Sequence, residues 1–244
     1  MAFNAAQYQA TVTKIDSGLD SLTTKLNQLV DKAKSVARKW FVPGPVGKAL
    51  VWCVNKMVSL GKWVIGKISE LLKGAAIPIT AFKYGVTWQT DVRGPATDVV
   101  GNVTTDALQA PKNWKGDGAT AYTSATKMQP TAATQIATMA DKVVTAMSAC
   151  AVAGLAFYVS LGVILVKLIV ATVAAIAASA TVVFSWAGIL SIVTAAKIEA
   201  GLIITTVSLL VAALGLQGQQ LTTVKGEAVD NRAFPRGKWP VATA

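Results

Sequence analysis

The feature that most constrains this fold is a nearly uncharged stretch, residues 143–224. Its 82 residues carry three formal charges, at Lys167, Lys197 and Glu199. Uncharged runs of 24, 29 and 17 residues cover positions 143–166, 168–196 and 200–216. A helix needs about 20 apolar residues to cross a bilayer, so the first two runs are long enough and the third is marginal. Because these segments are apolar on every side, either protein or lipid has to shield them from water. We therefore predict a hydrophobic, membrane-capable helical hairpin over residues 143–216.

Two interpretations of this hairpin stay open: insertion into a membrane, or a fully buried helix pair inside a soluble bundle. Small residues dilute the apolar runs and suit the second interpretation. Lys167 at the bilayer centre would cost about 2.5–3.5 kcal/mol, so we expect it to mark the end of a span or to snorkel. The residues predicted to insert are Leu155, Phe157, Leu161, Ile164, Leu165, Leu168, Ile169, Val182, Phe184, Trp186, Ile189 and Leu190.

The charge balance narrows the class of partner. Only 14% of residues are charged, against about 25% in typical soluble domains. The net charge is nevertheless +11, which favours an anionic partner. The chain has only four arginines and its lysines are dispersed, so nucleic-acid readout is unsupported. Membrane lipid, in particular anionic lipid, is the expected partner.

No constellation of catalytic residues is present in the sequence. Histidine is absent, which removes histidine-based acid–base chemistry, Ser-His-Asp triads and most zinc sites. The acidic residues are scattered, and no phosphate-binding loop precedes a helix. We therefore expect no enzyme activity, no cofactor and no metal. Cys53 and Cys150 lie in apolar surroundings, which favours two buried thiols over a disulfide.

Residues 1–42 carry a heptad pattern, with apolar residues alternately four and three positions apart. This pattern is typical of a helix that packs side by side with another helix. The positions of the seam are Tyr8, Val12, Ile15, Leu19, Leu22, Leu26, Leu29, Ala33, Val36 and Trp40. The partner helix could belong to this chain or to another copy. Lysines dominate one flank of the seam, so packing inside a larger bundle is favoured over a parallel self-pair.

Residues 46–74 are predicted to form a basic amphipathic helix that ends before Pro78. Lysines and tryptophans of this composition are typical of a helix at an anionic membrane surface. The predicted membrane-surface residues are Lys48, Lys56, Lys62, Lys67, Trp52 and Trp63. The alternative is a solvated lysine face on an ordinary bundle helix.

Residues 79–147 are predicted to form a helical hairpin. Its first arm is interrupted at Gly94-Pro95, a tight connection follows at residues 113–118, and Pro130 is expected to kink the second arm. Beyond the hydrophobic region, residues 217–244 turn polar and basic, with no core-forming pattern. We expect this tail to be loosely ordered.

A short motif lies at the tight connection of this hairpin. It reads Trp114-Lys115-Gly116, followed by Asp117-Gly118-Ala119-Thr120-Ala121-Tyr122, and an Ala/Thr-rich helix is predicted over residues 131–147. Residues 99–147 resemble the WXG family of small helical-hairpin proteins exported by type VII secretion systems. The resemblance implies that Gly116 relieves the turn while Trp114 packs across the two helices. It covers about a fifth of the chain, and the export signal of a tyrosine followed four residues on by an acid is missing, since Thr126 follows Tyr122 and Gly162 follows Tyr158. In this family a heteromeric secretion partner can carry that signal.

The sequence thus predicts an all-α fold: an elongated helical bundle with a WXG-like helical hairpin and a long hydrophobic helical hairpin. The expected function is membrane insertion by a self-assembling, pore-forming or channel-like protein whose hairpin is shielded by residues 1–73 until it meets a target membrane. The first residues lack a Sec signal pattern, so we expect secretion by another route or association with the cell envelope. The alternative is a soluble or membrane-resident structural subunit of a secretion or other oligomeric assembly.

Overall fold

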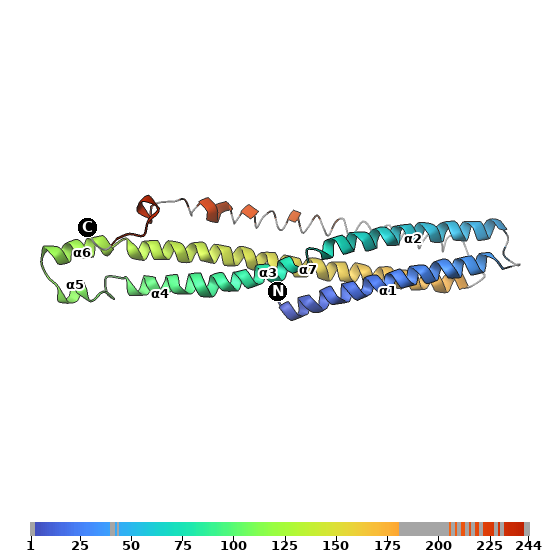
Figure 1. The fold of residues 1–244 in the computed structure, drawn as a ribbon, viewed down its shortest axis with the longest axis horizontal. Coiled ribbons are helices and arrows are strands. Elements are labelled where there is room, and N and C mark those ends of the chain that lie inside the picture. The colour runs from blue at the N-terminus through green and yellow to red at the C-terminus, as the bar shows by residue number, and fades with distance from the viewer. Residues whose placement is uncertain are drawn as a thin grey trace. The chain divides into compact units, whose positions relative to one another are not determined.

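A computed structural model describes residues 3–39, 42, 44–180, 205, 208, 211–212, 215, 218–219, 222–226, 229 and 232–241. Within these residues the chain is all-α, as predicted, and contains no strand (Figure 1). The α-helices are α1 (Ala5–Ala37), α2 (Gly44–Leu72), α3 (Ala76–Thr87), α4 (Gly94–Asn102), α5 (Ala110–Asn113), α6 (Asp117–Thr126) and α7 (Gln129–Ala180). A π-helix, η1 (Trp88–Arg93), joins α3 to α4, and a short 3-10 turn, η2 (Pro235–Gly237), lies near the C-terminus.

The helices form two compact units. The chain passes from one unit to the other between Ile77 and Pro78, and again between Val152 and Ala153. The first unit contains α1, α2 and the second part of α7. The second unit contains α3 from Pro78 on, η1, α4, α5, α6, the first part of α7 and the C-terminal segment.

Helix α1 confirms the heptad prediction. Its start is capped by Asn4, whose side-chain oxygen accepts a hydrogen bond from the backbone N–H of Gln7 at 2.9 Å. Val12 is half-buried, and Trp40 lies outside the described residues. The buried seam consists of Tyr8, Ile15, Leu19, Leu22, Leu26, Leu29, Ala33 and Val36.

The partners of this seam are helices of the same chain. One buried cluster combines α1, α2 and α7, and its members are Leu29, Ala33, Val36, Leu50, Val54, Met57 and Ala175. Two glycines show how closely these helices approach. A Cβ atom added at Gly61 would lie 2.5 Å from Leu26 Cδ1, and one added at Gly18 would lie 2.7 Å from Leu165 Cδ2. The first unit therefore has an apolar core in which α1 contacts both α2 and α7.

Helix α2 matches its predicted range closely, but Pro78 has a different place from the one expected. A turn over residues 73–75 ends α2, and Pro78 lies buried in the first turn of α3. A proline is tolerated there because the first N–H groups of a helix have no intrahelical acceptor.

The predicted interruption at Gly94-Pro95 is wrong, because the backbone stays helical from Ala76 to Asn102. The π-helix η1 provides the physical reason. The N–H of Gly94 donates to the carbonyl of Gln89, five residues back, so the turn before Pro95 is wider than an α-helical turn. A wider turn gives the proline ring room that an α-helix would deny it. Pro130 likewise causes no mid-helix kink, because it is the second residue of α7.

The C-terminal segment over residues 232–241 is packed within the second unit, contrary to the loosely ordered tail that the sequence predicted. Ala233 and Pro240 are buried, and the Gln129 side-chain N–H donates to the Pro240 carbonyl at 3.1 Å. The rings of Phe234 and Trp239 lie 6.2 Å apart. Composition missed this docking because one amide and a few apolar contacts leave no periodic pattern.

Candidate membrane-active site

One helical stretch among the described residues, Asp117–Ala177, is long and apolar enough to cross a membrane by length and composition. Its most apolar part lies in α7. A core helix of a soluble protein passes the same test, but most of such a helix is buried. Here only 33% of the most apolar window is buried within the protein. Helix α7 is therefore covered on one side and open on the other.

The covered side holds most of the described residues predicted to insert. Leu155, Phe157, Leu161, Ile164, Leu165 and Leu168 are all buried, and Ile169 is half-buried. A Cβ atom added at Gly162 would lie 3.7 Å from Ile15 of α1, which places this side of α7 against α1. The predicted residues Val182, Phe184, Trp186, Ile189 and Leu190, and with them the second arm of the hairpin, lie outside the described residues.

The open side of α7 carries a row of exposed valines that sequence reasoning missed. Their exposed fractions run from 40% to 62%, and they recur alternately four and three residues apart. This valine row consists of Val159, Val163, Val166, Val170 and Val173. Lys167 is exposed beside it, in the middle of a continuous helix and not at a helix end. The row was hidden in the sequence because its neighbours are also apolar, so only packing distinguishes the two sides.

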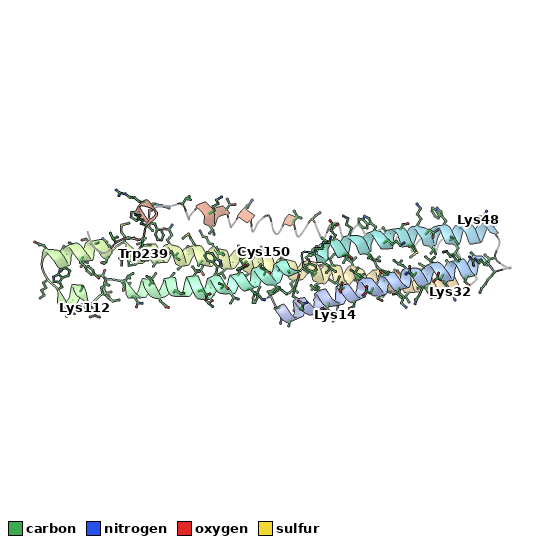
Figure 2. All side chains as sticks on the ribbon, in the orientation of Figure 1. Lys14, Lys32, Lys48, Lys112, Cys150 and Trp239 are labelled. Atoms are coloured by element: carbon green, nitrogen blue, oxygen red, sulfur yellow. The ribbon has the colours of Figure 1, made fainter. Side chains whose placement is uncertain are left out.

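Helix α2 brings all six predicted membrane-surface residues to one exposed face. At about 100° per residue they fall within an arc of roughly 140°. This Lys/Trp face consists of Lys48, Trp52, Lys56, Lys62, Trp63 and Lys67, all exposed to solvent. Figure 2 labels Lys48 near the start of α2. The two tryptophans therefore lie on the same face as the lysines.

Nearly all the charge on the Lys/Trp face is positive. The ammonium of Lys56 lies 5.8 Å from the centre of the Trp52 ring, a cation–π distance. The one acid on α2, Glu70, forms an ion pair with Lys67 at 3.0 Å. The hydrogen bond from Lys67 and its charge hold the pKa of the Glu70 carboxyl below its ordinary value. The face is therefore suited to an anionic surface and offers aromatic rings to it.

Two buried tyrosines meet where α2 ends, a feature that the sequence did not single out. The Tyr8 hydroxyl donates to the Ala75 carbonyl at 2.8 Å, and the Tyr158 hydroxyl donates to the Leu71 carbonyl at 2.7 Å. Burial, followed by the neighbouring Tyr158, raises the pKa of Tyr8. The signal available in the sequence was a tyrosine at a seam position of α1, where a hydroxyl needs a buried partner.

The two cysteines are free thiols. Cys53 is buried in α2, and burial raises the pKa of its thiol. Cys150 is half-buried. Burial of this kind makes Cys53 an inert part of the core.

The WXG-like turn has its own local geometry. Gly116 has φ +97°, a conformation that favours glycine, and α6 begins directly after it. Trp114 is 48% exposed, and a Cβ atom added at Gly118 would lie 2.7 Å from its ring. The ring also lies 6.2 Å from that of Tyr122. Trp114 therefore packs along the start of α6, whereas the family resemblance implied packing across two helices.

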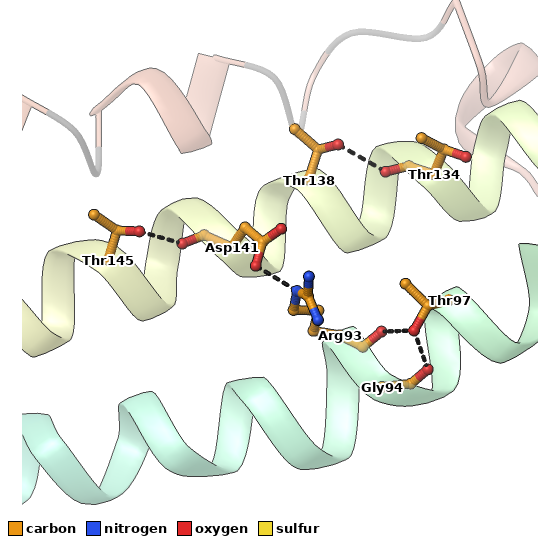
Figure 3. Close-up of polar contacts among 7 residues, drawn as sticks. All are labelled: Arg93, Gly94, Thr97, Thr134, Thr138, Asp141 and Thr145. Atoms are coloured by element: carbon orange, nitrogen blue, oxygen red, sulfur yellow. Dashed lines mark hydrogen bonds and ion pairs between the residues drawn. The ribbon is translucent and has the colours of Figure 1, made fainter.

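In the second unit the arms of the predicted hairpin run antiparallel. Gly85 of α3 approaches Met147 of α7, and Arg93 of η1 forms an ion pair with Asp141 of α7 (Figure 3). Figure 3 also shows the Thr97 hydroxyl donating to the carbonyls of Arg93 and Gly94, at 3.0 and 2.6 Å. These contacts fix α3, η1 and α4 along the first part of α7.

Comparisons with protein-family models, curated proteins and solved structures found no match for this chain. The WXG resemblance and the export route that it implies stay sequence-based predictions.

Proposed function

We propose that this protein is a membrane-active helical protein that binds an anionic bilayer and then inserts α7 together with the hydrophobic residues that follow it. One observation carries the proposal: the bulky apolar residues of α7 are buried against α1 and α2, while the opposite side of the same helix is open. The cover that the sequence assigned to residues 1–73 corresponds to α1 and α2.

Lipid can replace α1 and α2 as the apolar cover of α7. Burial of apolar surface stabilises by about 25 cal/mol per Å² whether protein or hydrocarbon excludes the water. The side chains of α7 can therefore exchange protein for acyl chains at little net cost, provided that the inner faces of α1 and α2 are covered by each other or by the bilayer. Exposure to water is what such a helix has to avoid, so release would occur at a membrane surface.

The Lys/Trp face supplies the first contact with that surface. Each lysine near an anionic leaflet contributes about 1 kcal/mol, and tryptophan is enriched at the headgroup level. The face stays exposed while the apolar side of α2 remains in the core, so docking does not require the cover to open.

The valine row supports self-assembly and also a second candidate function. Apolar residues at heptad spacing are typical of a helix–helix seam. In a membrane this seam would join inserted copies into a homo-oligomer. In solution the same seam would serve a structural subunit of a secretion apparatus, or of another assembly, with no insertion at all.

A reversible covalent lock separates these functions. Ile15→Cys and Gly162→Cys, with Cys53 and Cys150 replaced by alanine, would join α1 to α7. A Cβ atom added at residue 162 would lie 3.7 Å from Ile15 Cγ1, so the two positions are in van der Waals contact. Dye release is measured from vesicles of phosphatidylcholine and phosphatidylglycerol, before and after reduction of the lock.

We expect the oxidised protein to bind the vesicles without leakage and the reduced protein to release the dye. The Gly162→Cys single variant is the control, because it should leak under both conditions. Equal leakage from the locked and unlocked forms would contradict insertion by release of α7. Vesicle binding without leakage from the wild-type protein would favour the assembly subunit, and a need for detergent from the first extraction would favour a membrane-resident subunit.

A further inference from the structure

The junction at the end of α2 joins three helices through directional contacts. Tyr8 comes from the first turn of α1 and is fully buried, and Tyr158 comes from α7 and is 4% exposed. Their hydroxyls reach the carbonyls of Ala75 and Leu71. The two rings meet edge to face, with centroids 5.5 Å apart and planes at 87°.

The acceptor carbonyls lie where the helical ladder of α2 stops. The last four carbonyls of an α-helix have no intrahelical N–H donor, so those away from water need other donors. Leu71 lies in the last turn of α2, and its carbonyl also accepts from the N–H of Gly74 at 3.1 Å. Ala75 lies in the turn that links α2 to α3. The tyrosines thus tie α1 and α7 to the end of α2 and to the turn that follows it.

Aromatic neighbours surround the two tyrosines. The ring centroids of Phe3 and Tyr8 lie 5.7 Å apart, and those of Phe157 and Tyr158 lie 5.1 Å apart. Water is kept away from the hydroxyls, which makes each hydrogen bond harder to replace. This aromatic junction differs from the aliphatic core farther along α1 and α2, which has no directional contacts to lose.

We propose that Tyr8 and Tyr158 form a clamp that sets the rate at which α1 and α2 separate from α7, an inference that rests on the proposed function for its membrane consequence. Aliphatic side chains can exchange protein for acyl chains without loss. The two hydroxyls and their carbonyls cannot, because hydrocarbon offers no hydrogen-bonding partner. Breaking the clamp is therefore the costly step of opening.

The clamp is tested first without lipid, by hydrogen exchange of the full-length protein. Tyr8→Phe and Tyr158→Phe keep the rings and remove the hydroxyls. We expect the amides of residues 64–77 to exchange about tenfold faster for each hydroxyl removed, because a part-buried carbonyl at the end of α2 or in the turn after it loses a hydrogen-bond donor. Tyr84→Phe is the matched control, because Tyr84 is 58% exposed, and it should leave exchange unchanged.

A second control separates a local clamp from a general loss of stability. Ile15→Val removes one buried methyl group from the same unit, and its effect should spread evenly over α1 and α2. The tyrosine variants should instead accelerate residues 64–77 more than residues 22–33. Equal acceleration of both segments, or no acceleration beyond Tyr84→Phe, would overturn the clamp.

Dye release from the same anionic vesicles then tests the membrane consequence. We expect Tyr8→Phe and Tyr158→Phe to release the dye faster than the wild type. The fold increase in the rate of dye release should be about the same as the fold increase in the rate of hydrogen exchange. Leakage at the wild-type rate despite faster exchange would overturn the clamp as the rate-setting step and leave the proposed function intact. Faster local exchange with no leakage from any protein, the wild type included, would support the clamp and contradict the proposed function.

Discussion

Helices α1 and α2 both cover α7, yet they present different outer surfaces. Helix α1 carries four lysines and three aspartates, and no tryptophan. Helix α2 carries four lysines, one glutamate and two exposed tryptophans. The inner faces are alike because both have to match the same apolar partner. The difference teaches that shielding and surface recognition are separate properties, and that α2 alone combines them.

The largest expected effect comes from reversing charge on α2. Lys48→Glu, Lys56→Glu and Lys62→Glu together should weaken binding to anionic vesicles at least about 100-fold, since each lysine contributes about 1 kcal/mol. The same change on α1, at Lys14, Lys32 and Lys34, is the matched control and should have a far smaller effect. Figure 2 labels Lys14 and Lys32 on α1. Vesicle flotation measures both, and equal losses would remove the distinction between the two helices.

A glycine pair on α2 tests the inner face against the outer face. Gly61→Ala should lower the free energy of unfolding by about 1–3 kcal/mol, because its Cβ would lie 2.5 Å from Leu26 Cδ1 and the core would be overpacked. Gly66→Ala should raise it by about 1 kcal/mol, since no atom lies within 4 Å and alanine is the better helix former. Urea denaturation gives both values, and the same sign for both would show that α2 is not packed as described.

The cap of α1 gives a smaller effect. Asn4→Ala should destabilise the protein by about 1 kcal/mol, because the N–H of Gln7 loses its acceptor at the start of the helix. Asn4→Asp keeps an acceptor oxygen and should retain the stability. Thermal unfolding followed by circular dichroism distinguishes the two, and indistinguishable midpoints for wild type and alanine would exclude a working cap.

The smallest effect is expected at Glu70. Its ion pair with Lys67 is exposed, so Glu70→Gln should leave the unfolding midpoint unchanged. The same substitution frees the charge of Lys67 and should slightly tighten vesicle binding at low salt, with the gain disappearing as salt is added. Weaker binding in this titration would argue that the Lys/Trp face does not meet anionic headgroups.

Several parts of the structure followed from the sequence alone. The heptad spacing from Tyr8 to Val36 determined which side of α1 is buried, because helical periodicity is a local property of the chain. The lysine spacing likewise determined that Lys48, Lys56, Lys62 and Lys67 share a face of α2. The all-α class followed from the same helical periodicity and from the long apolar runs.

Other features were decided only by tertiary contacts. Helix α7 is apolar on every side, so its sequence could not separate the buried Leu161 and Leu165 from the exposed Val163 and Val166. The cover formed by α1 and α2 makes that choice, because burial depends on which neighbours arrive. The hydrogen bond from Tyr158 to Leu71 joins residues 87 positions apart and leaves no local pattern. Periodicity thus determines which faces a helix has, and packing decides what each face meets.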